Sequence, residues 1–186
     1  GGHPDCRKVP GVEASTGSLG HGLPMGVGMA MGLRIRTIDR RVIVLVGDGE
    51  CNEGMVWEAV MTANQYKLDN VVAIIDRNRL QSDGLSREVI DMDPMADKWK
   101  SFGWHVAEAD GHDVSDLLEV FHRKSRPKGR PYVVICHTTK GKGFSVFENN
   151  NDWHHSRLSK AVAIEALKEL GFENEAEEVE SYVTGH

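Results

Sequence analysis

Apolar residues gather in four short runs that predict strands, over residues 41–46, 71–76, 104–108 and 132–137. The first, second and fourth runs are almost continuously apolar, which is typical of parallel strands covered on both faces. Parallel strands need long crossover connections, so the segments between these runs are expected to hold helices.

Helical periodicity fills those connections. Between the first two strands, Met55, Ala59, Ala63 and Tyr66 recur three or four residues apart, which predicts a helix over residues 52–67. Further helices are predicted over residues 94–102, 114–124 and 158–170. This alternation predicts an α/β fold, a mostly parallel sheet with helices on both faces.

The two ends of the chain depart from this alternation. Residues 1–32 hold nine glycines, which favours backbone that passes close to a ligand or to a helix of a neighbouring subunit. Residues 173–180 are acidic and predict a solvated surface. We expect one domain over residues 1–186, with an acidic tail from 171 to 186 and an N-terminal portion missing before Gly1.

Charge and cysteine content narrow the function classes. The chain has 186 residues with 22 basic and 28 acidic side chains, a net charge of −6, which argues against a nucleic-acid or anionic membrane surface. Its longest apolar runs, residues 42–46 and 71–75, are too short to span a bilayer. Three scattered cysteines form no disulfide framework, which favours a reducing, cytoplasmic setting.

A glycine loop with the sequence GDGECNEG, residues 47–54, follows the first predicted strand and opens the next helix. Helix N-termini favour anions, yet the loop matches neither the dinucleotide fingerprint nor the P-loop. Asp48 stands between the first two glycines and would repel a bare phosphate. A phosphate here therefore requires a bridging cation, for which Mg²⁺ is the natural choice.

Asn78 lies thirty residues after Asp48, just beyond the second predicted strand. If the two strands are parallel neighbours, both side chains emerge at the carboxyl edge of the sheet, where α/β proteins bind ligands. Either residue alone is better explained as a turn residue that caps local backbone. Together, with a main-chain carbonyl nearby, they predict an oxygen-only metal–diphosphate site.

These motifs resemble the thiamine-diphosphate enzymes, whose signature is GDG followed some thirty residues later by Asn, and among them transketolase. The resemblance extends over nearly the whole chain. It includes Gly2-His3-Pro4, Gly11-Val12-Glu13, residues 15–22, 102–106 and 110–112, Lys140-Gly141-Lys142-Gly143 and Trp153-His154. Within residues 15–22, Ser18 stands where the family usually has Pro, and His21 where it has Gln.

The resemblance implies specific site residues. Mg²⁺ or Ca²⁺ would be held by Asp48, Asn78 and the main-chain carbonyl of Leu80. Thiamine diphosphate would be contacted by Gly17, Ser18, Leu19, Gly49, Asn78, Lys140 and His154. The catalytic residues would be His3 in the substrate channel, His154 near the reacting centre, and Glu53 linking paired cofactor sites across a subunit interface.

Several of these assignments have ordinary alternatives. Glu53 is equally well explained as an acid in the first turn of a helix, where the dipole favours it. Lys140 could be a plain loop charge, and His21 could lie near the cofactor or in solvent. His155 adjoins His154, and we prefer His154 because the Trp-His string of the family aligns there.

As a transketolase, the protein would move a two-carbon ketol unit from a ketose phosphate to an aldose phosphate. The family activates the cofactor's pyrimidine with a glutamate from a second domain, and nothing in this sequence resembles that domain. The resemblance therefore implies the N-terminal subunit of a split transketolase. Its partner would be a C-terminal subunit carrying the pyrimidine-binding domain, and two such pairs would form a heterotetramer.

Two other interpretations stay open at this point. The chain could belong to another thiamine-diphosphate enzyme, either a dehydrogenase E1 α-type subunit or a protein like deoxyxylulose-phosphate synthase. It could also be a non-catalytic scaffold subunit that binds cofactor. The GHP string and the Lys140–His154 features favour transketolase, while the sugar phosphates, and a role in the pentose phosphate pathway or in specialised metabolism, stay open.

Overall fold

The computed structural model describes residues 3–122 and 128–184. The chain forms two compact units, each described by itself below. The first comprises Gly1–Arg79 and Leu85–Thr138, and the second comprises Leu80–Gly84 and Thr139–His186.

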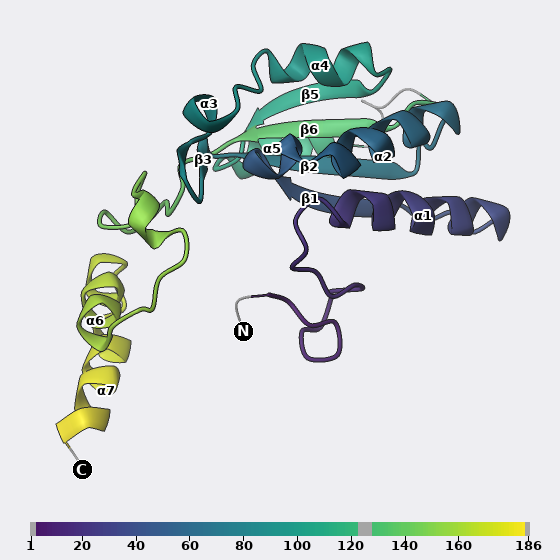
Figure 1. Cartoon of the computed structure of the whole chain (residues 1–186). Helices are drawn as coiled ribbons and strands as arrows, with labels where there is room; N and C mark the ends of the chain where they lie inside the picture. Colours follow the sequence, from purple (N-terminus) through teal and green to yellow (C-terminus); the bar gives the residue numbers. More distant parts are fainter. Residues whose placement is uncertain (1–2, 123–127, 185–186) are drawn as a thin grey trace. The chain divides into compact units, whose positions relative to one another are not determined.

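A four-stranded parallel sheet forms the centre of the first unit (Figure 1). Its strands follow the order β1 (Val42–Gly47), β2 (Val71–Arg77), β6 (Tyr132–His137) and β5 (His105–Asp110). All four predicted strands are therefore confirmed, with bounds shifted by at most two residues. The first two are parallel neighbours in which Gly47 pairs with Asp76, so their carboxyl ends meet at one edge.

Helices pack on both faces of this sheet, which confirms the α/β prediction. One face carries α1 (Gly22–Ile35), α2 (Gly54–Gln65) and α4 (Met95–Ser101). The other face carries α5 (Val114–Phe121), which packs through Leu117, Val120 and Phe121. The predicted helix over 114–124 ends earlier, and its last two positions lie outside the described residues.

The larger core lies on the face of α1, α2 and α4. Leu23 and Val27 of α1, with Val56 and Val60 of α2, pack against alternate side chains of the strands. Three indole rings extend this core: Trp99 lies 5.4 Å from Trp57 and 4.9 Å from Trp104 between ring centroids. The Trp104 indole N–H donates to the carbonyl of Val60 at 3.0 Å, so its buried polar atom is satisfied.

The prediction that the first strand is covered on both faces is wrong for the described residues. Ile43 and Leu45 of β1 are 58% and 70% exposed, whereas Val46 is buried. β1 is an edge strand, and α5 packs against β5 at the opposite end of the sheet. An apolar run alone cannot distinguish a central strand from an edge strand whose outer face is uncovered.

The second unit is built mainly of helices. α6 (Lys160–Glu169) packs against α7 (Glu173–Thr184), and the acidic segment predicted as a solvated surface forms part of α7. The short helix η3 (Asn151–Trp153) ends with Trp153, whose ring contacts Phe147. Phe147 also contacts Phe144, so the three rings form an aromatic cluster. None of the helices in the described part of the chain is long and apolar enough to cross a membrane.

The remaining elements are short and connect the sheet to the rest of the chain. They are the 3-10 turn η1 (Gly49–Asn52), the hairpin strands β3 (Leu80–Gln81) and β4 (Gly84–Leu85), and the one-turn helix α3 (Ser86–Val89). Because η1 directly follows β1, it fixes the glycine loop at the carboxyl edge of the sheet.

Candidate functional site

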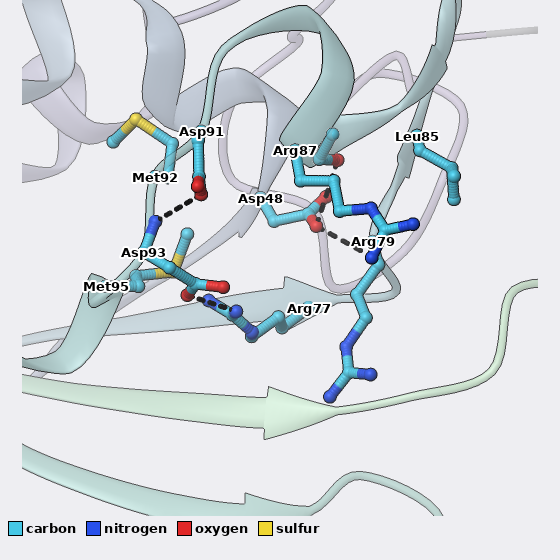
Figure 2. A pocket seen from close by; sticks show the side chains of 10 residues that line it. Asp48, Arg77, Arg79, Leu85, Arg87, Asp91, Met92, Asp93 and Met95 are labelled. Carbon is cyan, nitrogen blue, oxygen red and sulfur yellow. Dashed lines mark hydrogen bonds and ion pairs between the residues drawn. The ribbon is translucent and has the colours of Figure 1, made fainter.

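Asp48 is a buried carboxylate at the carboxyl end of β1, only 3% exposed. Its Oδ1 accepts a hydrogen bond from the N–H of Gly49 at 2.8 Å. Its Oδ2 accepts from the N–H of Arg79 at 2.8 Å and from the hydroxyl of Ser86 at 3.2 Å, as the dashed lines of Figure 2 indicate. The segment after β2 is therefore tied to the GDG loop, as the predicted strand adjacency requires.

Burial raises the pKa of the Asp48 carboxyl, because a charge in this setting loses its hydration. Hydrogen bonds from the Arg79 and Gly49 N–H groups oppose that rise, and the charge of Asp76 adds to it. The ionised carboxylate is thus costly by itself, and a bound cation would offset that cost. Oδ1 accepts the Gly49 N–H, and a carboxylate oxygen has capacity for a second partner.

Asn78 is oriented by a second carboxylate. Its Nδ2 donates to Oδ2 of Asp76 at 3.1 Å, and Oδ1 of Asp76 accepts from the hydroxyl of Thr138. Because the amide nitrogen faces Asp76, the amide oxygen is turned away from that carboxylate. Amide and carboxylate oxygens are the hard donors that Mg²⁺ and Ca²⁺ prefer.

These residues fit a divalent cation. Among residues 3–122 and 128–184 there is no cluster of three His, Cys, Asp or Glu side chains suited to a metal. The predicted site therefore depends on one carboxylate, one amide and one main-chain carbonyl. Leu80, which would supply that carbonyl, is the first residue of β3 and belongs to the second unit, so its role stays a prediction.

A second group of predicted residues lies beside the GDG loop. The N–H of Gly20 donates to Oε1 of Glu50 at 2.9 Å, and the N–H of Gly47 donates to Oε2 of the same side chain at 3.1 Å. Gly20 has φ +81°, and a Cβ atom there would lie 2.7 Å from Cβ of Glu53. The structure therefore brings Gly20 together with Glu50 of the GDG loop and with Glu53.

His3 lies against this same segment. A Cβ atom on Gly17 would be 3.0 Å from Cγ of His3, so the imidazole ring packs directly over that glycine. His3, Ser18 and Leu19 are all exposed, Leu19 to 58%. The predicted substrate histidine and the predicted cofactor contacts thus share one accessible stretch of the first unit.

His154 and Lys140 come together in the second unit. Nε2 of His154 lies 3.3 Å from the hydroxyl of Ser82, whose carbonyl accepts from Nδ2 of Asn151 at 3.0 Å. Partial desolvation lowers the pKa of His154, and the positive charge of Lys140 lowers it further. Both effects favour the neutral form of the imidazole. His154 and His155 are both exposed, so the contact with Ser82 is what favours His154.

Asp48 also lines a cavity of about 430 Å³, together with charged side chains of both signs (Figure 2). Arg77 forms an ion pair with Asp93 and lowers the pKa of that carboxyl. The guanidinium groups of Arg79 and Arg87 join no ion pair among the described residues. Sequence reasoning assigned neither arginine, and the structure places both at this cavity.

Several residues that shape the site were missed by sequence reasoning. Asp76 and Thr138 orient Asn78, Ser86 contacts Asp48, and Glu50 joins two loops. Asp76 could have been noticed, because it ends a predicted strand and pairs with Gly47, the first residue of the GDG loop. For Ser86, Thr138 and Glu50 the sequence carries no signal, since each acts on backbone or side chains far along the chain.

The profile of the family described as "Transketolase, thiamine diphosphate binding domain" matches residues 1–186. A subunit of apulose-4-phosphate transketolase from Phocaeicola vulgatus is 47% identical over 169 residues, covering 91% of this chain and 60% of that protein. The 6-deoxy-6-sulfo-D-fructose transketolase subunit SqwG of a Clostridium species is 36% identical over 168 residues, covering 90% of this chain and 61% of that protein.

Solved structures agree with these matches. Transketolase from Campylobacter jejuni superposes with a TM-score of 0.80 at 29% identity, covering 88% of this chain and 27% of that chain. A transketolase of Pichia stipitis in complex with a sugar phosphate superposes with a TM-score of 0.81 at 29% identity. The match covers 97% of this chain and 29% of that chain. This chain therefore spans about three fifths of the curated subunits and under a third of the full-length enzymes.

Proposed function

We propose that this chain is the N-terminal subunit of a two-chain transketolase, because it belongs to the family of transketolase thiamine diphosphate-binding domains. It would hold the diphosphate of thiamine diphosphate through a divalent cation, Mg²⁺ or Ca²⁺. A partner subunit would supply the pyrimidine-binding domain. The names of the two apulose-4-phosphate relatives, which mark each of them as one subunit of an enzyme, support this division between two chains.

The single observation that carries the proposal is the buried Asp48 carboxylate at the end of β1, with the backbone that follows Asn78 bound to it. A structural aspartate in a turn is normally exposed or fully neutralised. Here burial raises the pKa of the carboxyl, while Asp76 adds negative charge nearby. A cation between this carboxylate and a diphosphate would neutralise both.

The residues of this chain have distinct roles in the proposed reaction. Asp48 and Asn78 would hold the cation with the Leu80 carbonyl, and the exposed glycine segment at 17–20 would contact the pyrimidine end of the cofactor. His3 packs over that segment and would bind substrate oxygens. His154, with its lowered pKa, would offer a neutral imidazole that can accept a proton. When bound, the cofactor supplies the carbanion and the electron sink for ketol transfer.

The proposal for the substrate names only its chemical class. The similar subunits carry names that specify apulose 4-phosphate and 6-deoxy-6-sulfo-D-fructose, which lie outside the common pentose phosphates. We therefore favour a ketose with an anionic terminal group and a role in specialised sugar metabolism. The pentose phosphate pathway is the alternative that substrate profiling would test.

The surface of α1 supports association with a further chain. Met25 and Met29 are each 42% exposed, and a Cβ atom added to Gly28 or Gly32 would meet nothing within 4 Å. Exposed glycines inside a helix cost stability, and they allow close approach of another helix. This face would join either the partner subunit or a second copy, giving the proposed dimer of pairs in which Glu53 links the cofactor sites.

Reconstitution tests the proposal. Ketol transfer should require this chain, the partner subunit, thiamine diphosphate and a divalent cation together. Robust turnover by this chain alone would contradict the proposal. Turnover with pyruvate in place of ketose phosphates would instead support the alternatives of an E1 α-type or deoxyxylulose-phosphate synthase-like subunit.

The scaffold alternative needs a separate test. If the chain only binds cofactor and assembles with its partner, Asp48→Ala should leave the activity of the assembled pair intact. We expect that variant to assemble normally, as judged by size-exclusion chromatography, and to lose ketol transfer.

A further inference from the structure

Glu50 connects two backbone segments, at Gly20 and at Gly47, that are 27 residues apart in the sequence. One carboxylate oxygen, Oε1, accepts the N–H of Gly20 at 2.9 Å, and the other, Oε2, accepts the N–H of Gly47 at 3.1 Å. Gly20 precedes α1, and Gly47 is the last residue of β1. The two oxygens of a single side chain therefore hold two separate backbone segments at a fixed spacing.

The approach of these loops is close. The backbone of Gly20 has φ +81°, and a Cβ atom there would clash with the Glu53 side chain at 2.7 Å. The Gly20 amide is therefore pressed against the start of α2, and the Glu50 carboxylate satisfies its N–H. Hydrogen bonds to an ionised acceptor are roughly twice as strong as neutral ones, which suits this side chain to fixing the loop.

We propose that Glu50 is a positioning residue that locks the glycine segment at 17–20 to the GDG loop. The identity of the ligand rests on the proposed function above. That function puts the pyrimidine end of the cofactor at 17–20 and the diphosphate end at the GDG loop. Glu50 thus sets the spacing between the two ends of the site before the ligand arrives, which lowers the ordering cost of binding.

Glu50→Gln is the sharpest substitution for testing this role. Glutamine keeps the length of the side chain and one acceptor oxygen, but its NH₂ group would face a second N–H donor. One of the two bonds must then be lost. Glu58→Gln is a matched control, because Glu58 is an exposed side chain on the adjacent helix α2.

Amide hydrogen exchange of the chain without ligand measures the connection directly. In Glu50→Gln the protection of the Gly20 amide, the Gly47 amide or both should fall by roughly tenfold, while Glu58→Gln leaves both unchanged. Unchanged protection of both glycines in Glu50→Gln would overturn the proposal. This measurement needs neither cofactor nor partner, so its result is independent of the proposed function.

The second measurement is the affinity for thiamine diphosphate in the presence of Mg²⁺ and the partner subunit, by titration calorimetry. Glu50→Gln should raise the Kd by roughly tenfold, and the KM for cofactor should rise more than kcat falls. Lost amide protection with an unchanged Kd would overturn the positioning role. If the wild-type assembly binds no thiamine diphosphate, the proposed function fails, while the exchange result still decides whether Glu50 joins the loops.

Discussion

At the scale of single residues, the site depends on placing negative charge where water is scarce. Asp48 is buried, receives hydrogen bonds from Gly49, Arg79 and Ser86, and still has a raised pKa. Three hydrogen bonds therefore do not fully offset the loss of hydration. The ionised form of this carboxylate is therefore disfavoured by its surroundings, and a divalent cation would stabilise it.

The pH dependence of stability follows from that cost. Because the folded-state pKa of Asp48 is raised, its contribution favours folding below the unfolded-state pKa and is lost as the pH rises through the folded-state pKa. Asp48→Asn removes this titration. The free energy of unfolding of the variant should therefore decrease less over that rise in pH than that of the wild type. Urea denaturation in the absence of metal measures it. Parallel pH profiles for the two proteins would contradict the assignment.

The charge of Lys140 provides a second residue-scale test. Lys140→Met removes a nearby positive charge, so the pKa of His154 should rise toward its ordinary value while partial burial keeps it below. An NMR titration of the imidazole measures the change. Lys142→Met is the control, since Lys142 pairs with Glu148 at 3.6 Å and should leave His154 unaffected. Equal effects of both substitutions would refute a specific Lys140–His154 interaction.

Sequence reasoning identified the side chains that follow strands and missed those that act across the fold. Asp48 and Asn78 were found because parallel strands bring their carboxyl ends together, and the structure bears out that adjacency. Glu50 was missed because its partners, the N–H groups of Gly20 and Gly47, are backbone atoms without a sequence signature. The direct sharing of a metal ion by Asp48 and Asn78 stays a prediction.

At the scale of elements, the strands were predictable and helix α1 was not. Three of the four strands, β1, β2 and β6, carry nearly unbroken apolar runs, and such runs separated by turns are readily recognised as strands. α1 contains Gly22, Gly26, Gly28 and Gly32, which obscure the helical periodicity and lower intrinsic propensity. Its helix forms because Leu23, Val27 and Ala30 are buried against the sheet.

Two glycines of α1, Gly26 and Gly28, lie in different surroundings, so alanine should have opposite effects on stability at the two positions. A Cβ at Gly26 would lie 2.4 Å from Cγ2 of Val44, so Gly26→Ala should lower the free energy of unfolding by about 1–3 kcal/mol. Gly28 is open, so Gly28→Ala should raise it by about 0.5–1 kcal/mol. Chemical denaturation of the isolated chain measures both.

Gly28→Ala also tests the proposed interface. If the exposed side of α1 packs against another chain, Gly28→Ala should weaken that association even though it stabilises the isolated chain. Sedimentation velocity with the partner subunit would detect the loss. Unimpaired assembly of Gly28→Ala, combined with higher stability, would contradict the interface on this face of α1.

At the scale of the whole molecule, the proposed function makes this chain one part of a larger site. Asp48, Gly49 and Asn78 follow neighbouring parallel strands at the carboxyl edge of the sheet. His3 packs over Gly17 on an exposed stretch, and Gly20 of the same stretch binds Glu50 of the GDG loop. Ile43, Leu45 and Met29 are exposed apolar side chains that a partner subunit would cover under this proposal. Sequence reasoning predicted a partner, whose identity this chain alone does not encode.

The central claim is that Asp48 binds a divalent cation which in turn holds the diphosphate of thiamine diphosphate. Calorimetric titration of thiamine diphosphate into the assembled pair, with Mg²⁺ or with EDTA, tests it most directly. We expect binding that requires Mg²⁺ and that weakens by roughly a hundredfold or more in Asp48→Asn. Equal affinity of the wild type and Asp48→Asn, or binding that is unaffected by EDTA, would contradict the account.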